Sequence, residues 1–153
     1  MHKRARAWST WLQVAILLSV LAGASYWLVN AETGTLDRSA VKSTVSELRS
    51  QAAAGRLLAE QSARGELTRT FLETQVEQSR KNIDSERKEL KSPSIAPEVI
   101  APSMRASTLA VRLNDDYAAL PRTYGDANTS AALQREFDSL FSELKSLEEG
   151  LGE

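Results

Sequence analysis

The chain has 153 residues, of which 42% are hydrophobic and 25% are charged, close to ordinary globular usage. Its net charge of −1 gives no electrostatic reason to expect nucleic-acid binding. The absence of Cys excludes disulfides, thiolate metal sites and Cys nucleophiles. The single His, at position 2, leaves little scope for imidazole catalysis, and no glycine-rich phosphate loop occurs. We therefore expect no catalytic residues, no metal and no cofactor, and a protein that is not an enzyme.

The N-terminal part predicts a membrane anchor. Residues 11–29 carry no charge, and 19 residues of helix extend about 28 Å, close to the ~30 Å hydrocarbon core of a bilayer. Aromatic residues stand at both ends of this stretch, where interfacial belts are expected. These predicted membrane-interface residues are Trp8, Trp11, Tyr26 and Trp27. We interpret residues 8–29 as a single transmembrane helix.

The distribution of charge predicts the orientation of this anchor. Residues 1–7 form a basic tail without acids, and the positive-inside rule places such a tail in the cytoplasm. The cations that set this topology are Lys3, Arg4 and Arg6. From residue 32 onward there are 16 basic and 20 acidic residues, so the bulk of the chain is mildly acidic. We expect a single-pass protein of the cell inner membrane with a periplasmic or extracellular C-terminal domain.

A cleaved secretory signal is the alternative interpretation of the same stretch. Val29, Asn30 and Ala31 place small or apolar residues at the positions that specify cleavage, directly before Glu32. The apolar run is longer than the usual signal core of ~7–15 residues, and aromatic residues flank it at both ends, which favours a retained anchor. Cleavage near Ala31 would release the domain instead.

The region after the anchor predicts an all-α domain. Residues 30–35 form a short polar linker, and the domain covers residues 36–151. Residues 36–91 contain no proline and are rich in helix formers. Gly65 interrupts the apolar stripe but has no Pro, Asn or Asp beside it, which is weak punctuation. We therefore favour one continuous helix over 36–91.

The C-terminal third predicts two further helices after a proline-rich loop over 92–102. Apolar residues recur every three or four positions over 103–120, and again over 129–151. The second stripe has the cleanest rhythm in the chain and is predicted to pack against other helices. Its members are Leu133, Phe137, Leu140, Leu144, Leu147 and Leu151.

Two architectures fit this pattern. In the one we favour, the helix over 36–91 and a broken return arm over 103–151 form a long antiparallel hairpin, similar to a coiled coil. In the other, the chain turns near Gly65 and forms a four-helix up-down bundle.

Two functions fit the sequence. The first is a non-catalytic, membrane-anchored helical protein that acts by protein–protein contact, as an accessory subunit, adaptor or spacer. Its partners would be the lipid bilayer and either another protein or a second copy, without nucleic acid. The alternative is an extracytoplasmic small-molecule binding or sensor bundle, which cleavage near Ala31 would secrete. Its ligand would be acidic, because Arg105 and Arg112 lie seven residues apart on one helical face.

Overall fold

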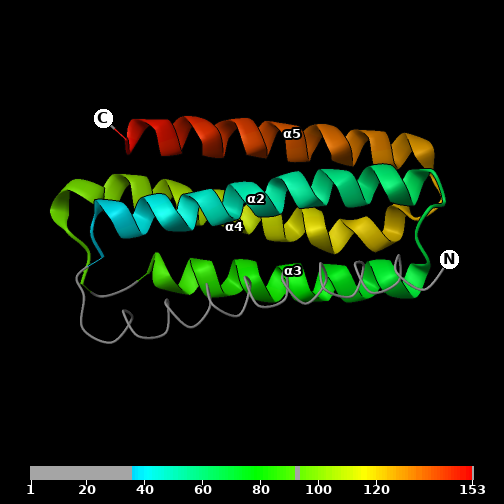
Figure 1. The fold of residues 1–153 in the computed structure, drawn as a ribbon, viewed down its shortest axis with the longest axis horizontal. Helices are drawn as coiled ribbons and strands as arrows, with labels where there is room; N and C mark the ends of the chain where they lie inside the picture. Colours follow the sequence, from blue (N-terminus) through cyan, green and yellow to red (C-terminus); the bar gives the residue numbers. More distant parts are fainter. Residues whose placement is uncertain (1–35, 92–93, 153) are drawn as a thin grey trace, which may run out of the picture. The chain divides into compact units, whose positions relative to one another are not determined.

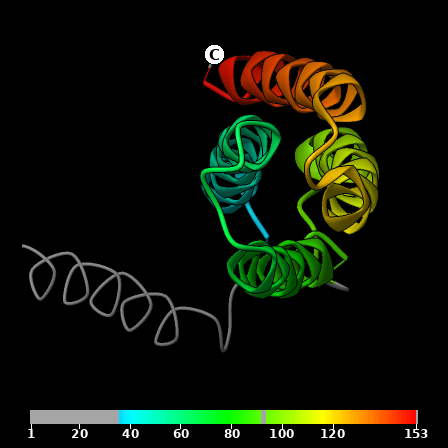
Figure 2. The ribbon, with the colours of Figure 1, turned by 90° about the vertical axis from the view of Figure 1, so that its right-hand side faces the viewer.

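The computed structural model describes residues 36–91 and 94–152, which form a bundle of four α-helices (Figure 1). Their bounds are α2 Arg38–Ala63, α3 Arg69–Glu89, α4 Ile100–Ala119 and α5 Ala127–Gly150, with short 3₁₀ helices η1 Pro97–Val99 and η2 Leu120–Thr123. Successive helices run in opposite directions. Seen end-on, they occupy four corners, and α5 returns to lie beside α2 (Figure 2). The predicted all-helical class and the helical bundle are therefore confirmed.

The prediction of one continuous helix over 36–91, and with it the long hairpin, is wrong. The chain turns after α2, where Gly65 adopts a φ of +69°. The amide of Gly65 donates to the Ser62 carbonyl, and the amide of Glu66 donates to the Gln61 carbonyl. These two bonds form a Schellman motif, which satisfies carbonyls at the helix end and requires a left-handed residue at its centre. The four-helix bundle with a turn near Gly65 is the architecture found.

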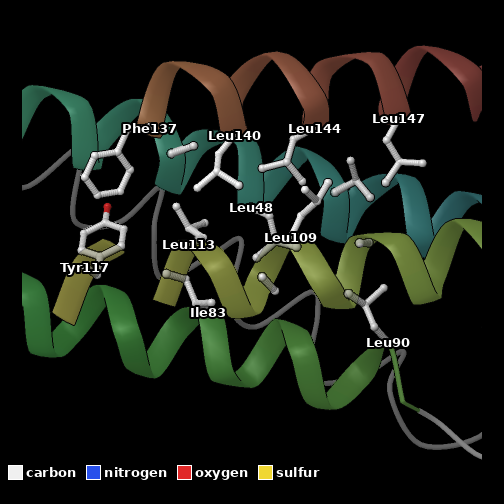
Figure 3. Packing of buried hydrophobic residues seen from close by; sticks show 14 of the residues in the cluster. Leu48, Ile83, Leu90, Leu109, Leu113, Tyr117, Phe137, Leu140, Leu144 and Leu147 are labelled. Carbon is white, nitrogen blue, oxygen red and sulfur yellow. The ribbon is translucent and has the colours of Figure 1, made fainter. Parts of the chain in front are cut away.

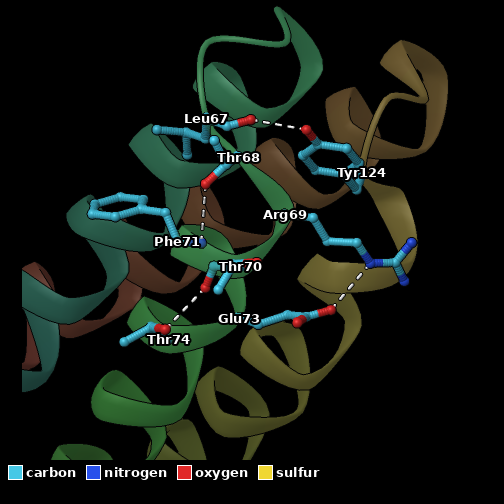
Figure 4. Close-up of polar contacts among 8 residues, drawn as sticks. All are labelled: Leu67, Thr68, Arg69, Thr70, Phe71, Glu73, Thr74 and Tyr124. Carbon is cyan, nitrogen blue, oxygen red and sulfur yellow. Dashed lines mark hydrogen bonds and ion pairs between the residues drawn. The ribbon is translucent and has the colours of Figure 1, made fainter.

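The first turn of α3 is fixed from two sides (Figure 4). The Thr68 hydroxyl accepts a hydrogen bond from the Phe71 amide at 3.3 Å and caps the helix N-terminus. The Tyr124 hydroxyl, from the turn that precedes α5, donates to the Leu67 carbonyl at 2.9 Å. The two inter-helix turns at this end of the bundle are therefore tied together.

The two C-terminal helices begin earlier than the sequence predicted. We expected a loop through residue 102, but α4 starts at Ile100 and includes Pro102 in its first turn. Proline is tolerated there because the first amides of a helix have no intrahelical acceptor. We expected the last helix to start at residue 129, but Asp126 caps it by accepting from the amides of Asn128 and Thr129.

Large and small residues interlock in the core (Figure 3). The second half of α2 buries only small side chains, and Gly55 lies directly under the Phe137 ring of α5. That ring meets the Tyr117 ring of α4 edge to face, with centroids 5.3 Å apart. The Tyr117 hydroxyl donates to the Gln51 carbonyl of α2 at 2.7 Å. One aromatic pair thus joins three helices.

The end of the bundle at which the described residues begin, at Leu36, is called the entry end. Leu36 pairs with Ile95 in an isolated parallel β-bridge, which ties the start of the domain to the α3–α4 connection. Arg38 donates to the carbonyls of Leu151 and Gly150, so a cation caps the C-terminus of α5. The opposite end, with Gly65 and Gly125 in its turns, is called the far end.

The predictions for the basic tail (1–7), the anchor (8–29) and the linker (30–35) fall outside the described residues. They include the interface residues Trp8, Trp11, Tyr26 and Trp27 and the topology residues Lys3, Arg4 and Arg6. Among the helices of the described part, none combines the length and the apolar character that crossing a membrane requires.

Candidate functional surfaces

The leucine-rich stripe of α5 lies inside the bundle. Its six residues are at most 8% exposed: Leu133, Phe137, Leu140, Leu144, Leu147 and Leu151. Leu140 and Leu144 point toward α2 and α4 (Figure 3). The stripe is therefore occupied by contacts within the chain.

Arg105 and Arg112, the tentative ligand residues, both lie on the exposed face of α4. They are two helical turns apart, which is about 10 Å along the axis. The Arg112 guanidinium donates to the Glu143 carboxylate of α5 at 2.9 Å, and both side chains are partly exposed. An acidic ligand held by both arginines would have to displace Glu143.

An open groove with a volume of about 360 Å³ follows the outer side of α3 next to Pro121. Charged side chains of both signs line it, including Glu77, Arg80 and Lys81. Lys81 pairs with Glu77 one turn away, and Arg80 donates to the Asn114 side chain at 3.0 Å. The groove does not include Arg105 or Arg112, and its charged groups already have partners.

Three half-buried carboxyl groups are held in unfavourable surroundings. Burial, with the nearby charges of Glu89 and Glu47, raises the pKa of Glu86 to about 7, although a hydrogen bond from Thr44 opposes the shift. Burial raises the pKa of Glu89 to about 7. Burial and the Glu136 charge raise the pKa of Asp116 to about 6. None of the three belongs to an ion pair within residues 36–91 and 94–152.

Exposed apolar side chains gather on α4. Among the described residues, the large hydrophobic side chains that remain exposed are Leu57, Phe71, Ile100, Met104, Val111 and Tyr124. Three of them, Ile100, Met104 and Val111, follow one another along the outer side of α4 at spacings of four and seven residues. Met104 is the most exposed, at 67%. This row was not predicted from the sequence, because Ile100 was assigned to a loop.

The described residues contain no cluster of three or more side chains suited to holding a metal ion. Comparison of the chain with protein-family models, with curated proteins and with solved structures finds no match.

Proposed function

We propose that this chain is a single-pass membrane protein whose helical bundle lies outside the cytoplasm. It would act by non-catalytic protein–protein contact, as an accessory subunit, adaptor or spacer. The observation that carries the proposal is the charge-free stretch 11–29, flanked by aromatic residues and preceded by a basic tail. A linker of six residues, 30–35, joins this stretch to the entry end of the bundle.

The construction of the bundle agrees with a scaffold role. The leucine-rich stripe of α5 is buried within the bundle, whereas a row of apolar side chains on α4 remains exposed. Uncovered apolar rows on otherwise polar domains often mark contact surfaces. The alternative function, binding of an acidic small molecule at Arg105 and Arg112, has less support because Arg112 is engaged with Glu143.

Mass spectrometry of the full chain, extracted gently from its own membrane, tests this proposal. We expect an intact N-terminus and a second polypeptide retained in stoichiometric amount. A chain that begins at Glu32 would contradict the anchor. A retained small acidic molecule without a protein partner would favour the binding module instead.

A charge placed within the predicted span provides a matched test of the anchor itself. A charged side chain at the centre of a spanning helix costs about 2.5–3.5 kcal/mol on insertion scales. We expect Leu17→Lys, combined with Leu18→Lys, to move the chain from the membrane fraction to the soluble fraction. Leu57→Lys, at an exposed position of α2, should leave the distribution unchanged.

A further inference from the structure

The first turns of α4 present an apolar surface at the entry end of the bundle. Ile100 is 45% exposed and Met104 is 67% exposed, one turn apart on the same side of the helix. Ile95, five residues before Ile100, pairs with Leu36 in the bridge that opens the domain. The exposed apolar pair therefore belongs to the end of the bundle at which the N-terminal segment arrives.

The length of the linker limits how far this end can lie from a bilayer. Six residues, 30–35, extend at most about 22 Å when fully stretched. If the anchor ends near Val29, as the proposed function requires, the entry end stays within that distance of the lipid headgroups. Leu57, the exposed apolar residue of α2, lies 19 residues beyond the start of the helix, about 28 Å along its axis.

The charged residues around the apolar pair suit a headgroup region. Lys91 and Arg105 are exposed at this end, and their long side chains can reach lipid phosphates while their stems cover apolar surface. Asp37, Glu98 and Glu149 are acids exposed at the same end, so the surface carries both signs and suits zwitterionic lipid. Apolar side chains on a helix that are flanked by basic residues are typical of interfacial contact.

We propose that the first turns of α4, through Ile100 and Met104, contact the bilayer that holds the anchor, so that the bundle stands with its entry end on the membrane. This inference rests on the proposed anchor. It assigns Ile100 and Met104 to lipid and leaves Val111, farther along the outer side of α4, for the protein contact of the proposed function.

The Cys-free chain allows a direct test with single labels. The first label is attached through Ala101→Cys, because Ala101 is exposed between the two apolar residues. The matched control is Leu57→Cys, because Leu57 is exposed closer to the far end. Each full-length variant is labelled with an environment-sensitive fluorophore and placed in phosphatidylcholine nanodiscs, with or without lipids that carry a quencher. We expect several-fold quenching of the label at position 101 and none at position 57.

A second pair of substitutions distinguishes contact from mere proximity. Replacing both apolar residues, Ile100→Ser with Met104→Ser, should abolish quenching at position 101, because these exposed residues contribute little to the core. Unchanged quenching in that variant, or equal signals at positions 101 and 57, would overturn the proposal. A label at 101 that is shielded but not quenched by lipid would also overturn it, in favour of a second copy or another protein.

The same samples separate failure of this contact from failure of the anchor. Intact mass reports whether residues 1–31 are present, and co-elution with the nanodisc reports insertion. An inserted chain without quenching refutes only the contact, whereas a truncated or free chain refutes the anchor and the contact together.

Discussion

Two parts of the bundle are held together in different ways. Along the α2–α5 pair, the most extensively packed pair of helices, eight of the 26 residues of α2 are buried and a glycine lies against an aromatic ring. Helix α3 buries only four of its 21 residues: Leu72, Val76, Ser79 and Ile83. It also carries two half-buried carboxyl groups with raised pKa values. Close packing therefore stabilises one side of the bundle, whereas the other is attached by a narrow stripe beside unfavourable charges.

Substitution of Gly55 is expected to disturb the close packing of the α2–α5 pair and to have the largest effect on stability. An added Cβ would lie 2.6 Å from Cζ and 2.7 Å from Cδ1 of Phe137, so the ring would have to move. In an unconstrained helix Gly→Ala stabilises by up to ~1 kcal/mol, but overpacking of a core costs about 1–3 kcal/mol. We therefore expect Gly55→Ala to lower the stability of the full chain by about 1–3 kcal/mol in chemical unfolding followed by circular dichroism.

The matched control for this substitution is Gly150→Ala, at the last position of α5, where an added Cβ meets nothing within 4 Å. It should be neutral or stabilise by a few tenths of a kcal/mol. If the two substitutions changed the stability equally, the close approach of Phe137 to Gly55 would not matter for stability. The main difference between the α2–α5 pair and α3 would then be removed.

Two glycines show how much of this fold the sequence could reveal. Gly55 and Gly65 both interrupt the helix-forming stretch 36–91, but the apolar stripe loses its phase only around Gly65, which made that glycine the better candidate for a turn. Gly65 ends α2 because its left-handed conformation allows two capping bonds. Gly55 lies within the helix, where Phe137 occupies the space that a side chain would fill. Local periodicity predicted the buried face of α5 and indicated a break near Gly65, but it could not decide whether the chain turns there, because no Pro, Asn or Asp marks the position.

The starts of α4 and α5 were mispredicted for a related reason. Pro102 was interpreted as part of a loop, although the first turn of a helix accepts proline. As a result, the exposed apolar row that begins at Ile100 could not be recognised from the sequence. One error in the predicted start of a helix therefore concealed this row. The prediction that Arg105 and Arg112 lie on the same helix was correct.

Removal of one hydroxyl group should weaken the junction of α4 with the tighter side. The Tyr117 side chain is fully buried, and its hydroxyl donates to the Gln51 carbonyl. We expect Tyr117→Phe to cost about 0.5–1.5 kcal/mol, the usual net contribution of an intramolecular hydrogen bond. Tyr124→Phe is the control, because its hydroxyl donates to the Leu67 carbonyl from a partly exposed position, and it should cost less when both variants are compared by chemical unfolding.

The stability of the fold should depend on pH because of the half-buried carboxyl group of Glu86 in α3. The pKa of Glu86 is about 7 in the fold and ~4.3 in an unfolded chain, so its ionisation disfavours the folded state. The stabilising effect of the protonated carboxyl is complete below about pH 4 and is lost as the pH rises through about 7. The melting temperature should therefore be higher at pH 5.5 than at pH 8.

Replacement of the same carboxyl tests whether it causes this trend. Glu86→Gln should raise stability at pH 8 by roughly 1 kcal/mol and have little effect near pH 4.5, which flattens the pH profile. Glu98→Gln, at an exposed position of η1, should leave the profile unchanged. A wild-type profile that falls on acidification through this range would contradict the assignment.

The smallest expected effect is a gain in stability on the small-residue face of α2. Ser62 is fully buried, and its hydroxyl has no hydrogen-bond partner within the described residues. A buried hydroxyl without a partner loses its bonds to water and gains none in the fold, so its removal is favourable. We expect Ser62→Ala to stabilise the chain by about 0.5–1 kcal/mol in chemical unfolding, helped by the higher helix propensity of Ala. Ser43→Ala, at an exposed position of the same helix, reports the contribution of helix propensity. A gain at Ser62 no larger than the gain at Ser43 would show that the buried hydroxyl does not weaken this side.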